Sequence, residues 1–150
     1  MDLILWRHAE AVDGTPDMAR KLTAKGEKQA REMAQWLRPR LPKYTRIIVS
    51  PAQRTLQTAK ALTEEFEILR DLAPGASPTA ILAAAQWPDR ADAVLVVGHQ
   101  PGLGMVAATL IADEPIPWSI KKGGLWWLSH RVRGEQAQVV LRAVVSPDLL

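Results

Sequence analysis

The 150-residue sequence contains no cysteine, and this absence excludes several chemistries at once. Without thiols the chain forms no disulfide, holds no thiolate-bound metal and has no cysteine nucleophile. The lack of cysteine is also compatible with a reducing compartment, so we expect a cytoplasmic protein as the default. The apolar run at residues 3–6 ends at Arg7 and is far shorter than a signal-peptide core or a membrane span. We therefore expect no attachment to a membrane.

The sequence also lacks a strong excess of charge of either sign. It has 19 Lys and Arg against 16 Asp and Glu, a net charge of +3 that modestly favours anionic ligands. The densest basic groups, at residues 38–43 and 121–122, are interpreted as solvated faces. No RNA-binding motif or finger-type Cys/His spacing is present, so we expect no nucleic-acid partner. No P-loop or G-x-G-x-x-G motif is present either, so we expect no nucleotide cofactor.

What the sequence does contain is a composition typical of a globular protein, with 47% hydrophobic and 23% charged residues. No Ser/Gly-rich linker, low-complexity tract or internal repeat divides it. We therefore expect one domain spanning residues 1–150.

Three short apolar segments, residues 3–6, 46–49 and 93–97, have the pattern of buried strands. They are apolar at successive positions, rather than alternating, and each stops abruptly at a polar residue or glycine. Strands that are buried on both faces are typical of parallel sheets. Residues 125–128 and 138–145 also resemble strands, joined by the polar stretch 129–135.

Four helices are predicted between these strands. The first has a stripe of apolar side chains that ends before Pro39: Ala30, Met33, Ala34 and Leu37. For the second, Ser50 is expected as N-cap of a capping box that Gln53 completes. A short third helix is predicted after Ser77-Pro78, and a fourth over residues 103–111. Alternating strands and helices predict an α/β fold, a three-layer sandwich with a largely parallel central sheet.

Polar residues follow the three predicted parallel strands directly, where open α/β sheets bind their ligands. Arg7 and His8 follow the first strand, and His99 follows the segment at 93–97. Arg54 lies one helical turn into the helix after the second strand. We expect these two histidines and two arginines to converge on one edge of the sheet.

This set of residue types suits phosphoryl transfer, in which charge spreads over three equatorial oxygens. Arg7 and Arg54 are predicted to bind those oxygens, because guanidinium matches phosphate bidentately. A neutral imidazole is a nucleophile near pH 7, and we predict that role for His8, with the charge of Arg7 disfavouring its protonation. His99 is predicted to stabilise the developing charge. Two histidines beside arginines lack a third metal ligand, so no metal is expected.

Four sequence motifs then carry a resemblance to a known family. The stretch R-H-A-E-A at residues 7–11 resembles the RHG/RHA motif of the histidine phosphatase superfamily, the phosphoglycerate mutase-like proteins. Residues 20–30, 50–59 and 97–101 are similar to its R-x-L-T-x-x-G-x-x-Q-A, S-P-x-x-R-x-x-Q-T-A and second-histidine motifs, in the same order. The short chain and the G-H-Q-P segment most resemble the SixA-type phosphohistidine phosphatases.

This resemblance implies a metal-independent phosphatase without cofactor that forms a phosphoenzyme on His8. It implies hydrolysis of phosphohistidine on a protein such as a histidine-containing phosphotransfer domain. Arg20, within the second motif, is a further substrate-binding candidate, although a solvated or structural role is equally compatible with its position. For Glu10 structural support is at least as plausible as tuning of His8, and His130 is interpreted as structural.

One departure from the larger relatives bears on the substrate. Those proteins carry an insertion that supplies an acidic proton donor, whereas the segment between Ala59 and Val94 leaves little room for one. Its acids are expected on solvated faces: Glu64, Glu65, Glu67, Asp71, Asp89 and Asp92. A missing donor favours a phosphoramidate, whose leaving nitrogen can be protonated beforehand.

Two alternatives keep the same residues. The first is a phosphomonoesterase that acts on a small phosphate ester. The second is a non-catalytic module that recognises phosphorylated partners.

Overall fold

The computed structural model describes residues 1–90 and 92–150, and these residues contain one six-stranded sheet with the strand order β3-β2-β4-β1-β5-β6. The strands are β1 (Asp2–Arg7), β2 (Arg46–Val49), β3 (Glu67–Ile68), β4 (Ala93–Gly98), β5 (Leu125–Arg133) and β6 (Gln136–Val145). Strands β3, β2, β4 and β1 are parallel to one another. Strand β5 is antiparallel to both β1 and β6.

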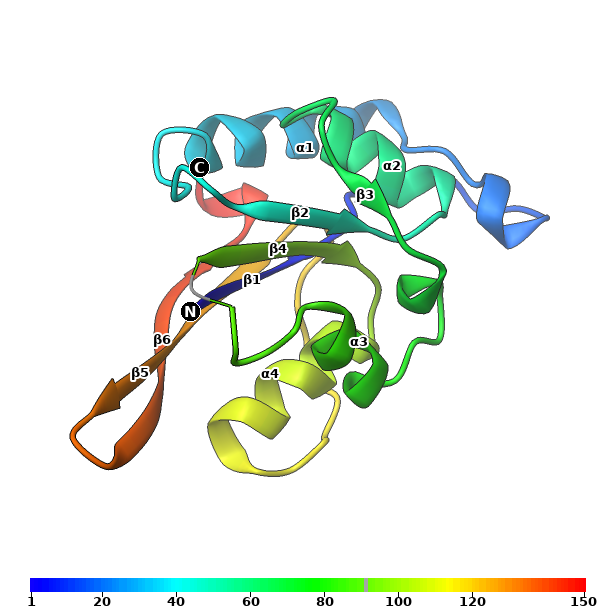
Figure 1. Cartoon of the computed structure of the whole chain (residues 1–150). Helices are drawn as coiled ribbons and strands as arrows, with labels where there is room; N and C mark the ends of the chain where they lie inside the picture. The colour runs from blue at the N-terminus through cyan, green and yellow to red at the C-terminus, as the bar shows by residue number, and fades with distance from the viewer. Residues whose placement is uncertain (91) are drawn as a thin grey trace.

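Helices cover both faces of this sheet. Helices α1 (Ala24–Leu37) and α2 (Gln53–Lys60) lie on one face, and α3 (Pro78–Ala84) and α4 (Gly102–Ala112) lie on the other (Figure 1). Three short 3-10 helices complete the described elements: η1 (Asp17–Ala19), η2 (Arg70–Leu72) and η3 (Pro147–Leu149). The predicted α/β three-layer sandwich with a largely parallel sheet is confirmed.

Strand β1 shows why the central strands are apolar at every position. Its side chains alternate between the two faces, so Leu3 and Leu5 join the core beneath α3 and α4. Ile4 and Trp6 join the core beneath α1 and α2. Because helices cover both faces, neither set of side chains reaches water, and residues 3–6 are fully buried.

The first, third and fourth predicted helices are confirmed with small differences. Helix α1 buries the predicted stripe from Ala30 to Leu37. Ser77 caps α3 by accepting a hydrogen bond from the backbone N–H of Ala80. Helix α4 buries Leu103 and Val106, but Ile111 is exposed and does not belong to its buried face.

The predicted start of the second helix is wrong. Helix α2 begins at Gln53 with Ala52 as its N-cap, so the capping box at Ser50 does not form. Ser50 instead ends the second strand region, where its backbone N–H donates to the carbonyl of Val97 on β4. This parallel-sheet contact holds Ser50 in extended backbone, and its hydroxyl points to another partner described below.

The C-terminal strands are longer than predicted. The polar stretch at 129–135 was expected as a connection, but β5 continues to Arg133 and the turn is confined to Gly134 and Glu135. Gly134 has φ +61°, which suits glycine in a tight turn. The end of this hairpin extends beyond the rest of the sheet (Figure 1). Residues 131–138 at this end are exposed, and polar residues are tolerated there because antiparallel strands can face water.

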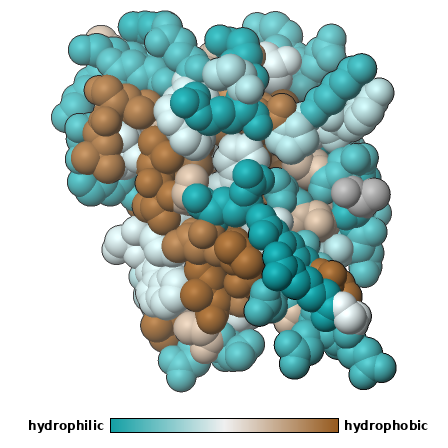
Figure 2. All heavy atoms as spheres, turned by 90° about the vertical axis from the view of Figure 1, so that its left-hand side faces the viewer, coloured by the Kyte–Doolittle hydropathy of each residue, from teal (hydrophilic) through white to brown (hydrophobic). Residues whose placement is uncertain are grey.

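Apolar side chains remain partly accessible along the outer strand of this hairpin. Figure 2, which faces the side at the left of Figure 1, shows apolar surface interspersed with polar groups. On β6, Leu141 and Val144 are exposed. Among residues 1–90 and 92–150, no helix combines the length and the apolar character needed to cross a bilayer.

Candidate active site

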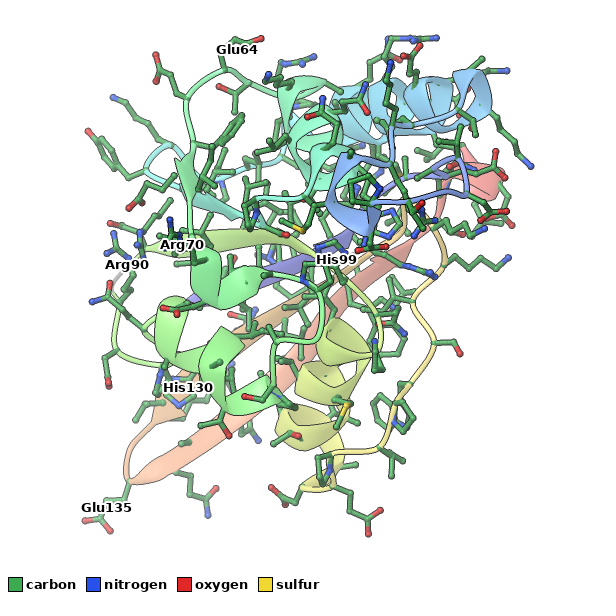
Figure 3. The ribbon with its side chains drawn as sticks, turned by 90° about the vertical axis from the view of Figure 1, so that its right-hand side faces the viewer. Glu64, Arg70, Arg90, His99, His130 and Glu135 are labelled. Carbon is green, nitrogen blue, oxygen red and sulfur yellow. The ribbon has the colours of Figure 1, made fainter. Side chains whose placement is uncertain are left out.

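The polar residues after β1, β2 and β4 line one pocket of about 230 Å³ at the carboxyl edge of the parallel strands. Strands β2 and β4 point to the right in Figure 1, and Figure 3 looks onto that side, with His99 near its centre. The structure brings all five residues predicted for the site to this pocket: Arg7, His8, Arg20, Arg54 and His99. Residues that are up to 92 positions apart along the chain therefore share one small cavity.

The backbone of His8 is held from both sides. Its N–H donates to the carbonyl of Gly98 at 3.1 Å, and its carbonyl accepts from the N–H of Gly123 at 2.9 Å. The Nδ1 atom of the ring lies 2.7 Å from the carbonyl oxygen of Ala9. Because a carbonyl oxygen only accepts, Nδ1 carries the hydrogen, and the neutral ring has its lone pair on Nε2.

The environment of His8 keeps this ring neutral. Burial lowers the pKa of His8 to about 4, opposed by the bond to Ala9 and assisted by the positive charges of Arg54, Arg7 and Arg20. We predicted the direction of this change from the charge of Arg7 alone, but burial is the larger cause. At pH 7 the Nε2 lone pair is available.

His99 occupies the same pocket, with its ring centroid 5.4 Å from that of His8. Its Nε2 lies 2.7 Å from the hydroxyl oxygen of Ser50. Burial lowers the pKa of His99 to about 3, with smaller contributions from the nearby charges of Arg54 and His8. His99 is therefore neutral as well, and its buried Nδ1 has no hydrogen-bond partner among the described residues.

Arg7 and Arg54 each have hydrogen-bond donors that are used and a donor that is not. Arg54 is only 4% exposed and donates from Nη1 to the carbonyl of Asp17 at 2.9 Å and from Nη2 to its carboxylate at 3.1 Å. Arg7 donates from Nη1 to the carbonyl of Ile120 at 2.8 Å. The Nε atoms of both guanidiniums are buried and find no partner within residues 1–90 and 92–150. Fixed guanidiniums with unused donors suit an anionic ligand.

Arg20 holds the loop that forms one wall of the pocket. Its Nε donates to the carbonyl of Val12 at 2.7 Å and its Nη1 to the carboxylate of Asp17 at 3.1 Å. Hydrogen bonds from Arg20 first, and from Arg54 second, lower the pKa of Asp17. Arg20 thus lines the pocket while it also organises Asp17 against Arg54.

Glu10 has a structural role in the described contacts. Its carboxylate accepts from the Thr23 hydroxyl at 2.8 Å, and its backbone N–H donates to the side chain of Gln29 at 3.0 Å. A Cβ atom at Gly26 would lie 1.9 Å from the carbonyl oxygen of Glu10. The Thr and Gly of the second motif therefore dock the start of α1 against the segment after His8.

The acids between Ala59 and Val94 stay away from the pocket. All six are exposed, as predicted, and none lines the cavity. Figure 3 shows Glu64 at the outer edge of the molecule, far from His99. The carboxylate that does line the cavity is Asp13, whose side chain is fully exposed. Within the part of the chain that the structure describes, no three His, Cys, Asp or Glu side chains gather as metal ligands.

Four residues of the site were missed from the sequence. Ser50 was interpreted as a helix cap and Lys122 as a solvated charge, and Asp13 and Asp17 were not considered. Lys122 lines the pocket, and Asp17 contacts Arg54 across 37 positions. Two signals for Ser50 were present: it directly follows a predicted parallel strand, at the ligand edge of the sheet, and it is the first residue of the S-P-x-x-R-x-x-Q-T-A motif.

His130 lies outside the pocket, as predicted. It sits on the β5–β6 hairpin, where its ring packs edge-on against Trp87 with centroids 5.5 Å apart. Figure 3 shows it well separated from His99.

Comparison with known proteins agrees with this geometry. Residues 3–75 match the model of the histidine phosphatase superfamily (branch 1). Phosphohistidine phosphatase SixA of Escherichia coli (strain K12) is 31% identical over 126 residues, which cover 78% of each chain. The chain belongs to the histidine phosphatase superfamily. It is therefore a phosphatase of the class that uses a histidine nucleophile and no metal. Membership favours an enzyme over the purely binding module that the sequence left open.

Two solved structures share the whole fold. The structure of the protein histidine phosphatase SixA complexed with tungstate has a TM-score of 0.82 at 26% identity and covers 99% of both chains. A phosphoserine phosphatase of Entamoeba histolytica has a TM-score of 0.71 at 17% identity, with 97% of this chain and 96% of that chain covered. The second likeness concerns the fold alone.

Proposed function

We propose that this histidine phosphatase removes phosphate from phosphohistidine on a protein, with His8 as the nucleophile. The observation that carries the proposal is the fixed tautomer of His8. Its Nδ1 hydrogen is bound by the carbonyl of Ala9, which leaves the Nε2 lone pair in a pocket that two guanidiniums also line. A nucleophile beside fixed cationic donors is the arrangement that phosphoryl transfer needs.

The reaction proceeds in two displacements. In the first, Nε2 of His8 attacks phosphorus, and the bond from phosphorus to the substrate nitrogen breaks with its electron pair going to that nitrogen. In the second, water attacks phosphorus, the bond to Nε2 breaks, and inorganic phosphate is released. Arg7 and Arg54 bind the equatorial oxygens in both steps, and His99 stabilises their developing charge.

The substrate class follows from the acids around the pocket. An alkoxide leaving group needs a proton from a positioned acid, which contributes about 10²–10⁴ in rate. The nearby carboxylates are Asp17, which is bonded to Arg54 and Arg20, and Asp13, which is fully exposed. Neither carboxylate is buried. An imidazole leaving group protonated on its second nitrogen does not require a positioned acid.

A protein substrate is supported by the surface next to the pocket. A groove of about 630 Å³ adjoins the site, and Arg7 and Lys122 border both cavities. Two acids line the groove, Glu32 and Asp148. The cationic side chains that line it are more numerous: Arg7, Lys25, Lys28, Lys121 and Lys122. Such a groove suits a protein that presents acidic residues beside its phosphohistidine, such as a histidine-containing phosphotransfer domain.

A small phosphate ester is the second possible substrate, and the presence of Asp13 at the pocket favours it. In its acid form the Asp13 side chain would supply the proton that an alkoxide leaving group needs. Comparing turnover of a phosphohistidine protein and of alkyl phosphates at pH 5 and 7 separates the two functions. Efficient alkyl phosphate hydrolysis that Asp13→Asn abolishes would establish the ester as substrate.

The test of the proposed nucleophile is the variant His8→Ala, with His130→Gln as the matched control. His8→Ala is expected to release no phosphate from a phosphorylated histidine-containing phosphotransfer domain. It is also expected to form no phosphoenzyme in rapid-quench labelling. His130→Gln, which replaces a histidine outside the pocket, is expected to retain both. Retained turnover in folded His8→Ala would refute the mechanism.

A further inference from the structure

The hydroxyl of Ser50 has few hydrogen-bond partners. Ser50 is fully buried, so its hydroxyl cannot donate to bulk water. Its oxygen accepts from the backbone N–H of Ala52 at 3.3 Å and lies 2.7 Å from Nε2 of His99. Among the described residues, Nε2 of His99 is thus the one acceptor within reach of the Ser50 hydrogen.

The two neutral tautomers of His99 differ in how many groups they leave without a partner. If Nε2 carried the hydrogen, it would donate to Ser50, and both the Ser50 hydrogen and the Nδ1 lone pair would be buried without partners. If Nδ1 carries the hydrogen, Ser50 donates to Nε2 and only the Nδ1 hydrogen lacks a partner. Buried polar groups are almost always hydrogen-bonded, so the second arrangement is favoured.

From this we infer that Ser50 is a positioning residue, which locks neutral His99 in the tautomer that carries its hydrogen on Nδ1. The inference rests on the proposed function only for its consequence. With Nε2 occupied by Ser50, Nδ1 is the nitrogen left for a ligand, and in this tautomer it is a donor toward phosphoryl oxygen. The opposite tautomer would present a lone pair to an anion and repel it.

The lock matters because His99 does not bind a second proton near neutral pH. Its ring is buried and surrounded by Arg54, Arg7 and His8, which oppose a further positive charge. A doubly protonated ring would donate from both nitrogens and need no help from Ser50. A neutral ring has one hydrogen, and its neighbours decide which nitrogen carries it.

The two pocket histidines therefore have related but distinct arrangements. In both rings Nδ1 is protonated, but Nδ1 of His8 is bound by a carbonyl whereas Nδ1 of His99 is unused. His8 consequently presents a lone pair from Nε2, and His99 presents a donor from Nδ1. One backbone carbonyl and one serine hydroxyl give identical side chains opposite chemical functions.

The direct test is the ¹⁵N NMR spectrum of the ring nitrogens in histidine-labelled protein at pH 7. The chain has three histidines, and His130→Gln and His99→Gln assign the signals. We expect wild-type His99 to show a protonated Nδ1 and an unprotonated Nε2. The opposite pattern would overturn the inference, and because no substrate is present, this result is independent of the proposed function.

Variants connect the tautomer to the chemistry. Ser50→Ala is expected to mix the two tautomers and to lower kcat for phosphoramidate about tenfold, with a smaller change in KM. Ser50→Thr keeps a hydroxyl and should restore both the spectrum and kcat. Thr55→Val is the matched control, because it removes a buried hydroxyl that bonds to the carbonyls of Ser50 and Ala52 rather than to His99.

The outcomes separate a specific role from a general disturbance of the fold. A fall in kcat in Thr55→Val equal to that in Ser50→Ala, or an unchanged His99 spectrum in Ser50→Ala, would show that Ser50 acts only through packing. If Ser50→Ala does not fold, the wild-type and Ser50→Thr spectra still decide the tautomer. An inactive wild-type protein with the expected spectrum would refute the proposed function and leave the tautomer assignment standing.

Discussion

The two ends of strand β1 use their polar residues in different ways. At its start, Asp2 accepts hydrogen bonds from Trp127, Ser129 and Arg142 and so ties β1 to the hairpin strands. At its end, Arg7, and beside it Arg54 and His99 from other elements, each have a buried nitrogen that finds no partner among the described residues. The same strand thus carries a carboxylate with three hydrogen-bond donors at one end and a guanidinium with an unused donor at the other. Unused buried donors indicate a ligand site, whereas a fully bonded carboxylate indicates a structural one.

Replacing an arginine at each kind of position should sharpen this comparison most. Arg54→Lys is expected to lower kcat/KM for phosphoramidate about 10²-fold, because an ammonium cannot reproduce two fixed guanidinium donors. Arg46→Lys is the control, since Arg46 already bonds to Glu67 and to the carbonyl of Ala84, and it should leave kcat/KM unchanged. Equal losses in the two variants would contradict the distinction.

Titration of groups at the two ends of β1 should lower the free energy of unfolding in different pH ranges. Because the folded pKa of His8 is about 4 and the ordinary value is 6.5, the unfolded chain binds more protons between these values. Stability is therefore full above about pH 6.5 and falls as the pH approaches 4, by roughly 3 kcal/mol from His8 alone. His99, with a pKa of about 3, should add a loss of the same sign over a slightly wider range.

Asp2 should respond at lower pH. Burial raises its pKa, but the hydrogen bonds of Ser129 and Trp127 and the charge of Arg142 outweigh burial and lower the pKa below 3.8. Its contribution is present above that ordinary value and is lost as the pH falls below it. Urea unfolding from pH 7 to 3, on wild type and on His8→Ala, checks both ranges. A wild-type curve that stays flat between pH 6.5 and 4.5 would contradict the burial of neutral histidines.

The smallest expected effect concerns the structural end of the strand. Asp2→Asn keeps the shape of the side chain but loses the charge that Arg142 pairs with. We expect it to lower the free energy of unfolding by about 2 kcal/mol and to leave kcat/KM of the folded enzyme unchanged. Denaturant unfolding and phosphoramidate kinetics measure the two quantities. A clear loss of kcat/KM in Asp2→Asn would mean that the two ends of β1 are coupled.

The same comparison explains what the sequence could predict. The strands that carry the site were predicted within one residue at each end, because burial on both faces leaves an uninterrupted apolar run that ends at the ligand edge. The hairpin was predicted too short, because an exposed antiparallel strand tolerates the polar residues that its sequence contains. Local patterns therefore located the parallel strands better than β5 and β6.

Side-chain contacts between distant loops were the part that local patterns could not supply. Ser50-Pro51 has the local sequence of a helix cap, yet the contact of Ser50 with His99 on another strand accompanies a different backbone. Asp17 begins the 3-10 helix η1, which is too short to leave a periodic pattern, and its pairing with Arg54 depends on how η1 packs against α2. Such contacts are decided by tertiary packing and leave no spacing rule in the sequence.

Because Asp17 pairs with Arg54, its carboxylate competes with any phosphate that Arg54 is proposed to bind. Because Asp17 is tethered to the same chain, its effective concentration at Arg54 is on the order of millimolar or higher. An incoming anion must exchange with this carboxylate, so simple ions that reach only Arg54 gain little. A phosphoryl group that also engages Arg7 and His99 gains more than it displaces. If Arg54 binds phosphate as proposed, we expect the carboxylate of Asp17 to pair with Arg54 again when phosphate leaves, because the two side chains are bonded in the empty site.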